Sequence, residues 1–422
     1  TSAKKISLSE QKATRKKWLQ FSLVINLGIL ALFKYLDFFI ESWNWATLKL
    51  PGTPEIETLG LLLPVGISFY TFQTMSYTID VYREKNEPYE DFLSFACYAA
   101  FFPQLVAGPI VRADHFQKQI STVLKPSSAK FRLGLTLIIY GLAKKLIIAD
   151  NVALHVNTIF ENSSGLDNIG LVWWGAFVFG IQIYCDFSAY TDIAIGSAHL
   201  LGIELPENFD TPYVATSPQD FWRRWHISLS TWLRDYLYIP LGGSRNGPKV
   251  LLFALMTTML LGGLWHGASW NFVLWGFMHG ILLIVHRWFV KRKFVRTMFE
   301  IIPRTSIVSG WIITQYFIFM TWLIFRLEDT ALLLQSLKTY IGIGGHGDRN
   351  EFLEGLPEIK YLTFAIVIMF VVGHFVSWIT GGLKYWIARQ NSIIWGFIIG
   401  TMLTLALFLR PIETVDFIYF RF

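Results

Sequence analysis

The stretch VLLFALMTTMLLGGLWHGASWNFVLWGFMHGILLIV, residues 250–285, decides the fold of this chain. It is apolar almost without interruption, and as one α-helix it would extend for roughly 54 Å at about 1.5 Å per residue. The hydrocarbon core of a bilayer is about 30 Å thick, so one straight helix of this length does not fit within it. We therefore expect two membrane spans joined within residues 262–271, where three glycines allow a tight turn and polar side chains appear together.

Similar apolar runs recur along the rest of the chain. Apolar residues make up 53% of the 422 residues and charged residues only 16%, against about 25% charged residues in typical soluble domains. Since each run is long enough to cross a bilayer as a helix, the sequence predicts an all-α integral membrane protein with about ten transmembrane helices. The expected spans are residues 18–40, 59–82, 92–111, 131–153, 168–190, 250–286 (two spans), 307–327, 361–383 and 393–410.

Basic side chains gather beside the spans, beginning in residues 1–17. Because positively charged loops stay on the cytoplasmic side, residues 1–17 are predicted to form a basic cytoplasmic segment. The net charge of +6 comes from basic residues that border membrane spans, and this placement argues against a nucleic-acid-binding protein. The longest polar loop, residues 342–358, is too short to fold alone, so residues 18–422 are predicted to form a single transmembrane domain.

One segment between the spans, Tyr213 to Gly247, is too polar to face lipid and too aromatic for an ordinary loop. Irregular backbone at membrane depth is tolerated only where protein buries it or where it lines a water-filled cavity. We therefore expect a re-entrant catalytic region at about residues 205–280. The alternative is an amphipathic helix at the membrane interface, with snorkelling arginines.

Two histidines lie in or beside these apolar stretches, His226 after Trp225 and His266 after Trp265. An ionisable side chain at membrane depth is costly and indicates a functional site by default. His266 falls at the glycine-rich break near Asn271, which favours a place on a tunnel wall over a packing role. Both histidines are therefore candidate functional residues.

A third polar set lies on the expected span 168–190 and just beyond it. Its members are Gln182, Tyr184, Asp186 and Asp192. Carboxylates in so apolar a context need cationic partners, which we expect among Arg223, Arg224 and Arg234. A structural ion-pair network is favoured over catalysis for these aspartates. Gln73 belongs to another polar helical face, formed by residues at three- and four-residue spacing.

Several sequence motifs carry a resemblance to a known family. The most specific is Trp222-Arg-Arg-Trp-His-Ile-Ser-Leu-Ser-Thr-Trp-Leu-Arg-Asp-Tyr236, and the others are Pro64-Val-Gly-Ile-Ser-Phe-Tyr70, Phe101-Phe-Pro-Gln-Leu-Val-Ala-Gly-Pro109, Tyr184-Cys-Asp-Phe-Ser-Ala-Tyr-Thr-Asp192, Leu205-Pro-Glu-Asn-Phe209 and residues 263–280. Together they resemble the membrane-bound O-acyltransferase superfamily. Within it, they are similar to the bacterial branch whose membrane subunits O-acetylate alginate, peptidoglycan and other envelope polysaccharides.

The resemblance implies helices arranged around a central tunnel, with further N-terminal spans that this sequence lacks. In that family the second histidine is catalytic and the first assists, which assigns His266 and His226 to these roles. His266 would either deprotonate the acceptor hydroxyl or carry the acyl group itself, and Asn271, His226 or a backbone N–H would stabilise the oxyanion. We expect supporting or tunnel-lining roles for Asn271, Trp265, Trp225, Asp186, Tyr184 and Gln73.

The expected donor is an acyl thioester, either acetyl-coenzyme A or a phosphopantetheine carrier, that reaches the site from the cytoplasm. Its phosphates suit the guanidinium groups of Arg223, Arg224 and Arg234. We expect no permanently bound cofactor and no metal site. The resemblance implies a multi-pass protein of the bacterial inner membrane, surrounded by lipid, whose periplasmic partner completes transfer to a polysaccharide. Two alternatives stay open: D-alanyl transfer from a carrier protein to a teichoic-acid-type acceptor and, in a different class, a transporter or channel.

Overall fold

The computed structural model describes residues 2–48, 50, 53–120, 127–161, 166–292, 297, 302–354, 356, 360–412 and 415–418. Within these ranges the regular structure is helical, apart from one isolated β-bridge. The expected all-α class is therefore confirmed. The elements are α1 (Ser2–Ser7), α2 (Lys12–Leu30), η1 (Ala31–Tyr35), α3 (Leu36–Thr47), α4 (Ile67–Tyr82), α5 (Phe92–Ala99), α6 (Ala113–Ile120), α7 (Ser128–Ala143), η2 (Lys144–Ala149), α8 (Asp150–Glu161), α9 (Ile169–Leu200), η4 (Pro212–Val214), α10 (Pro218–Arg224), α11 (Ile227–Leu233), η5 (Arg234–Tyr238), α12 (Pro248–His266), α13 (Trp270–Val290), α15 (Pro303–Arg326), α16 (Thr330–Tyr340), α17 (Arg349–Glu354), α18 (Lys360–Ile379), α19 (Leu383–Ala388) and α20 (Ser392–Leu409).

Seven helices in the described part of the chain are long and apolar enough to cross a membrane. They are Lys12–Thr47 (α2, η1 and α3 in one piece), Ile169–Leu200, Pro248–His266, Trp270–Val290, Pro303–Arg326, Lys360–Ile379 and Ser392–Leu409. Four of these helices begin with an expected start signal: α12 and α15 carry a proline in the first turn, and a side chain caps the start of α9 and α13. The chain is a multi-pass membrane protein.

Seven is fewer than the roughly ten spans expected, because three apolar runs are built differently. In the run 59–82, α4 begins only at Ile67, and the residues before it are not helical. In the run 92–111, α5 ends at Ala99, and prolines 103 and 109 follow in irregular backbone. The run 131–153 is helical throughout, but it contains Lys144, Lys145 and Asp150, whose charges are paired inside the protein.

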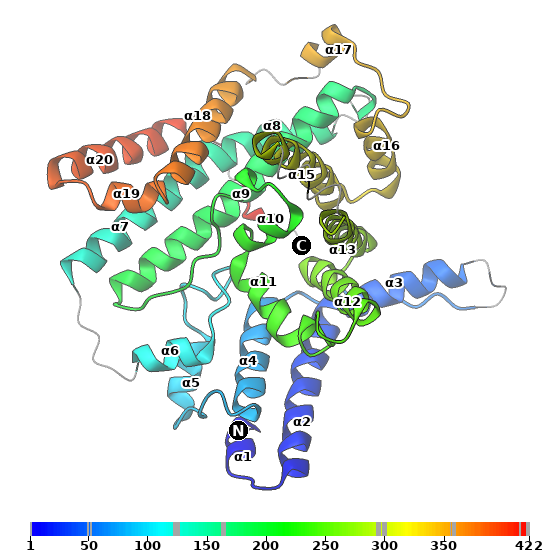
Figure 1. Ribbon diagram of the computed structural model, residues 1–422, viewed down its shortest axis with the longest axis vertical. Coiled ribbons are helices and arrows are strands. Elements are labelled where there is room, and N and C mark those ends of the chain that lie inside the picture. The colour runs from blue at the N-terminus through cyan, green and yellow to red at the C-terminus, as the bar shows by residue number, and fades with distance from the viewer. Residues whose placement is uncertain are drawn as a thin grey trace.

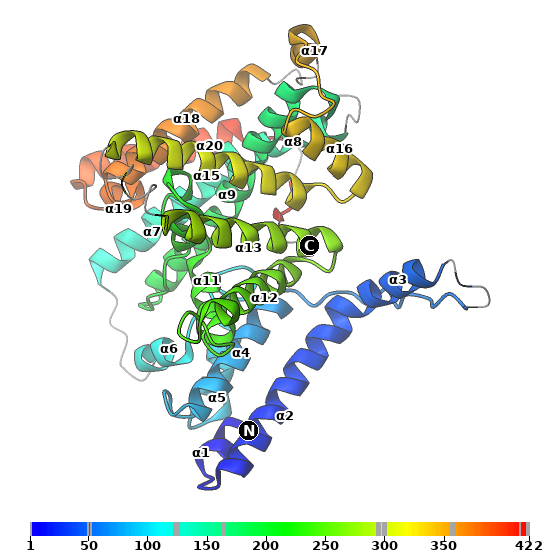
Figure 2. The ribbon, with the colours of Figure 1, turned by 45° about the vertical axis from the view of Figure 1, so that its right-hand side comes forward.

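The stretch 250–285 forms the expected hairpin, with α12 and α13 side by side (Figures 1 and 2). The turn is shorter than predicted, because α12 continues helically through Gly262 and Gly263 and ends at His266. A Cβ atom on Gly263 would lie 2.2 Å from the carbonyl oxygen of Phe272, and one on Gly276 would lie 2.2 Å from that of Met259. These two glycines therefore let the helices approach closely, as small residues do between membrane helices.

Helix α9 is the central element of the bundle, and much of it is buried. It packs along α7 and also contacts η2, α8, α15 and α16. The short helices α10 and α11 lie between α9 and the α12–α13 hairpin (Figure 1). Helices α2 and α3 form a long rod that runs from the N-terminal end outward past α12 (Figure 2).

Candidate active site

His266 is the last residue of α12, and only 4% of its surface is exposed. The chain leaves the helix there in extended backbone at Gly267, where a Cβ atom would collide with the Phe272 ring at 2.1 Å. Ser269 then caps α13 by accepting a hydrogen bond from the Asn271 N–H. The end of α12 fixes the backbone before His266. The close packing of Gly267 and the Ser269 cap of α13 fix the backbone after it.

His226 lies between α10 and α11 and is completely buried. Its backbone is left-handed, with φ of 42° and ψ of 56°. This conformation is uncommon for a residue other than glycine and persists only where the surrounding structure imposes it. Two bonds between segments hold it: the Ile227 N–H donates to the Asn208 carbonyl at 2.9 Å, and the Asp210 N–H donates to the Arg224 carbonyl at 2.9 Å.

A directed chain of hydrogen bonds fixes the His226 ring. The Ile110 N–H donates to Ser228 Oγ at 3.0 Å, and Ser228 Oγ donates in turn to Asn208 Oδ1 at 2.8 Å. Asn208 Oδ1 also accepts from the Ser228 N–H, and it lies 3.2 Å from His226 Nδ1. Because this oxygen only accepts, we assign the proton of the neutral ring to Nδ1. Nε2 then carries a lone pair, and it has no hydrogen-bond partner among the described residues.

The two imidazoles lie close together in an aromatic enclosure, with 6.5 Å between their ring centroids. Trp265 contacts both rings, at centroid distances of 5.9 Å from His226 and 5.2 Å from His266. Phe187 lies edge-on to His226, and Trp275 and Phe325 lie edge-on to His266. The apolar walls exclude bulk water and strengthen the polar interactions that form there.

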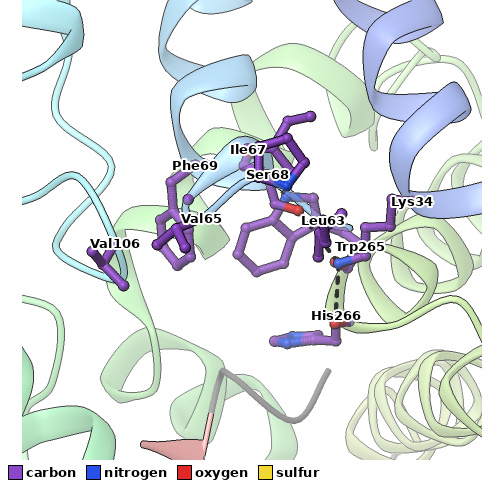
Figure 3. Close-up of a pocket in the computed structure, with 11 residues that line it drawn as sticks. Lys34, Leu63, Val65, Ile67, Ser68, Phe69, Val106, Trp265 and His266 are labelled. Carbon is purple, nitrogen blue, oxygen red and sulfur yellow. Dashed lines mark hydrogen bonds between the residues drawn. The ribbon is translucent and has the colours of Figure 1, made fainter. Parts of the chain in front are cut away.

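Two cavities approach α12 at different levels. The first, which we call the His266 cavity, measures about 320 Å³; Trp265 and His266 form one side of it, facing the segment from Leu63 to Phe69 (Figure 3). The second, the arginine cavity, measures about 610 Å³ and reaches Met259 of α12. Met259 and His266 are about 10 Å apart along the helix axis. His266 is therefore separated along α12 from the part of that helix that lines the arginine cavity, whereas Ile227, the residue after His226, lines the cavity itself.

The arginine cavity combines an apolar wall with a cationic rim. Its basic residues are Arg223, Arg234, His286, Arg287 and Lys291. Arg224, the third arginine expected to bind the donor, is not among them. It pairs with Asp220 at 3.0 Å and with Asp210 at 3.5 Å. The structure thus separates two neighbouring arginines that the sequence left equivalent.

Asp186 and Asp192 are buried in ion pairs, but the expectation of arginine partners was wrong. Asp186 pairs with Lys145 at 2.9 Å and accepts the Ile418 N–H at 2.7 Å. Asp192 lies 2.6 Å from Lys144 and 2.7 Å from Lys384. The lysines come from η2 and α19, and the sequence alone did not predict that these elements contact α9.

The other expected supporting residues have different surroundings. Trp265 lies beside both histidines, whereas the Nδ2 atom of Asn271 donates to the carbonyls of Leu327 and Glu328, at 2.7 and 3.0 Å. Both amide hydrogens of Asn271 are thus engaged just beyond the end of α15, which favours a bracing role over oxyanion stabilisation. Trp225 and Tyr184 pack against each other in the core below His226, and Gln73 is buried on α4.

Several residues of this region were missed by sequence reasoning. Asn208 lies inside a quoted motif, but only the fold shows that its oxygen meets His226. Lys34 contacts the end of α12, and its charge within an apolar run was a signal that could have been used. In the described residues, no group of three or more histidine, cysteine or carboxylate side chains is arranged to hold a metal ion.

Comparison with known proteins adds an independent finding. The profile described as MBOAT, membrane-bound O-acyltransferase family, matches residues 82–328. A peptidoglycan O-acetyltransferase of Helicobacter pylori is 34% identical, over 100% of this chain and 85% of the relative. A protein named "Probable alginate O-acetylase AlgI" from Azotobacter vinelandii is 38% identical, over 85% of this chain and 70% of the relative. A teichoic acid D-alanyltransferase of Bacillus subtilis is 28% identical, over 60% of this chain and 66% of the relative.

Proposed function

The chain belongs to the membrane-bound O-acyltransferase family and is therefore an acyltransferase; on that premise, we propose that it takes an acetyl group from a cytoplasmic thioester and delivers it for O-acetylation of an envelope polysaccharide. The observation that carries this proposal is the buried pair His226 and His266, of which His266 lines one cavity, while a second cavity with basic residues reaches the same helix α12. Family membership also favours transfer chemistry over the alternative of a transporter or channel.

In the proposed reaction His266 is the general base. It accepts the proton of an acceptor hydroxyl in the His266 cavity as the oxygen attacks the acyl carbon. A C–O bond forms, the C–S bond of the thioester breaks, and the proton passes to the leaving thiolate. The alternative is a two-step route, in which His266 first carries the acyl group on its ring nitrogen and then yields it to the hydroxyl.

The tautomer that we assign to His226 narrows its proposed role. With Nδ1–H directed at Asn208, the neutral ring presents a lone pair at Nε2 and no donor. Such a nitrogen accepts a hydrogen bond from a hydroxyl but donates none to an oxyanion. We therefore assign His226 to orienting the attacking hydroxyl and not to stabilising the developing negative charge.

The arginine cavity is the proposed donor site. Guanidinium groups pair bidentately with phosphate, and Arg223, Arg234 and Arg287 line this cavity. Its inner wall includes Leu255 and Met259, which suit the uncharged arm of a phosphopantetheine thioester. Basic residues at the ends of spans favour the cytoplasmic side. Acetyl-coenzyme A and a phosphopantetheine carrier share this chemistry.

The names of the relatives support a proposed acceptor. Two of them are named for O-acetylation of peptidoglycan and alginate, so a polysaccharide hydroxyl is the proposed final acceptor, reached directly or through a periplasmic partner protein. The proposed location is the bacterial inner membrane. The D-alanyltransferase relative supports a second candidate, D-alanyl transfer to a teichoic-acid-type acceptor.

One experiment tests the proposal. His266→Ala is expressed in place of the native protein, and alkali-released acetate and D-alanine are measured in the purified envelope polysaccharides. The expected result is loss of acetate to the level of a deletion strain, because general-base action contributes about 10²–10⁴ in rate. His155→Gln is the matched control, since His155 is equally buried and accepts the Trp174 indole N–H, a bond that a glutamine oxygen can keep. Normal acetate in His266→Ala at matched protein level contradicts the proposal, and loss of D-alanine instead selects the second candidate.

A further inference from the structure

The end of α12 is held by two neighbouring residues of the distant rod formed by α2 and α3. Lys34 Nζ donates to the carbonyl oxygens of Trp265 and His266, at 2.6 and 3.2 Å (Figure 3). Tyr35 donates its hydroxyl hydrogen to the Leu264 carbonyl at 2.9 Å. Lys34 Nζ also donates to Ser68 Oγ at 3.3 Å, on the far side of the His266 cavity. An ammonium group has three N–H donors, so all three are committed to protein atoms.

These contacts satisfy carbonyl groups that α12 leaves without a hydrogen-bond donor. The last four carbonyls of an α-helix have no partner within it, and together they carry the negative end of the helix dipole. In α12 these are the carbonyls of residues 263–266, and Lys34 and Tyr35 satisfy three of them. The exit at Gly267 is extended, so the chain itself supplies no left-handed cap of the kind that often closes a helix.

Lys34 is also unusual in its own setting. It lies within the apolar span Lys12–Thr47, where a charged side chain is costly and indicates function by default. The helix is locally a π-helix at residues 31–35, and such wide turns occur frequently at functional sites. From this turn two adjacent side chains both reach α12. The charge of Lys34, the π turn and the three capped carbonyls are separate observations, and all of them concern the contact with the end of α12 at His266.

We propose that Lys34 and Tyr35 are positioning residues, which hold the end of α12 and thereby present the His266 imidazole to the His266 cavity. This inference rests on the proposed catalytic role of His266. Lys34 has no N–H left for a substrate, so its effect is transmitted through the backbone of residues 264–266. A displacement of about 1 Å at a reacting group can lower a rate about 100-fold. Loss of the cap is therefore expected to lower turnover more than it lowers stability.

The test compares Lys34→Met, Lys34→Arg and Tyr35→Phe in cells, with acetate on the envelope polysaccharides and the thermal midpoint of the purified protein as readouts. Methionine keeps the length of lysine but donates nothing, whereas arginine keeps the charge and the donors. We expect Lys34→Met to reduce acetate about 10- to 100-fold, Tyr35→Phe by less, and Lys34→Arg to restore most of it. Ser42→Ala is the control, because it removes the bond from the Trp270 indole N–H to the same rod without touching the capped carbonyls.

The outcomes of this test separate the positioning role of Lys34 and Tyr35 from the proposed function. Acetate within twofold of the wild type in Lys34→Met, while His266→Ala has none, overturns the positioning role and leaves the proposed function intact. Full acetate in both variants removes the proposed function itself. Equal losses in Lys34→Met and Lys34→Arg, together with lowered thermal midpoints, also overturn the inference, because a structural lesion then explains them. If Lys34→Met does not accumulate, Tyr35→Phe decides in its place: wild-type acetate contradicts the inference, and a loss at an unchanged midpoint supports it.

Discussion

The imidazoles of His226 and His266 lie edge to face, with 6.5 Å between their ring centroids and 63° between their planes. A hydrogen bond spans about 3 Å, so a hydroxyl group placed between the rings reaches both. The two rings are held differently, however. His266 is fixed through its backbone at a helix end, whereas His226 is fixed through its ring nitrogen and a left-handed backbone. The two residues are therefore expected to respond differently to mutation.

The first prediction concerns His226. His226→Ala removes a hydrogen-bond acceptor but leaves the proposed base in place, so acetylation should fall and yet remain above that of His266→Ala. The measurement is acetate per unit of membrane-inserted protein for both variants and for the double variant. Identical background values for the two single variants would contradict an assisting role and point to one catalytic unit.

The second prediction concerns Asn208, whose oxygen accepts from both His226 and Ser228. Asn208→Leu leaves these donors unsatisfied, at about 1–3 kcal/mol for each buried group, and it frees the His226 ring to change tautomer. We expect a loss of activity in the protein that still folds. Asn151→Leu is the control, because the Asn151 amide is also buried and donates to backbone carbonyls, those of Leu146 and Ile147 in η2 and of Leu409 at the end of α20, away from the histidine pair. Equal specific activity in the two variants would sink the positioning role of Asn208.

The third prediction separates the arginines. Arg223→Lys and Arg234→Lys should raise the KM for acetyl-coenzyme A about three- to tenfold, since lysine cannot make the bidentate phosphate contact. Arg224→Lys should leave that KM unchanged, because Arg224 does not line the arginine cavity and pairs with Asp210 and Asp220, whereas Arg234 lines the cavity although it also pairs with Asp235. Purified protein assayed against increasing donor gives both values. A KM raised only in Arg224→Lys would move the donor site away from the arginine cavity.

The fourth prediction concerns the buried lysine of α19. Lys384 contacts both Asp192 and Glu207 at 2.7 Å, and although burial opposes it, these carboxylates raise the pKa of Lys384. A raised pKa keeps the lysine charged even where the pH rises above the ordinary pKa of a lysine, so the pairs persist throughout the physiological pH range. Lys384→Met should destabilise the fold, but by less than the about 3–5 kcal/mol expected for an isolated buried pair, because Asp192 keeps Lys144 and Glu207 is partly exposed.

Thermal unfolding of the purified variant checks this expectation. Lys130→Met is the control, because the pair of Lys130 with Glu204 is largely exposed and such pairs contribute about 0–1 kcal/mol. Similar midpoints for the two variants would mean that the buried network adds little to stability.

Hydrophobic patterning was sufficient for the helical membrane class and for the hairpin at residues 250–285. It misassigned the run 92–111, because apolar residues around Pro103 and Pro109 fill the protein interior without forming a helix. It also read Gly262 and Gly263 as part of the turn, although they lie within α12. A glycine that permits a bend and a glycine that permits close helix packing look alike in one sequence.

The site was harder to predict than the fold, because its partners come from distant segments. The histidines were visible as ionisable residues in apolar surroundings, but Asn208 and Lys34 gain meaning only once α10 and η1 are placed in space. Arg223 and Arg224 are neighbours in the chain, and roughly 100° of rotation per helical residue decides which one lines the cavity. No composition or spacing rule carries that information.

The charge network of Asp192, Glu207 and Lys384 also has a consequence for how the protein is made. Lys144 is synthesised before Asp192, so their pair can form as soon as α7 and α9 have both been inserted. The second cation, Lys384, follows 192 residues after Asp192 and 177 after Glu207. Until then Asp192 has only one of its two cations, and Glu207 has no lysine partner. The ion-pair network around α9 is therefore complete only after α19, close to the C-terminal end of the chain, has been synthesised.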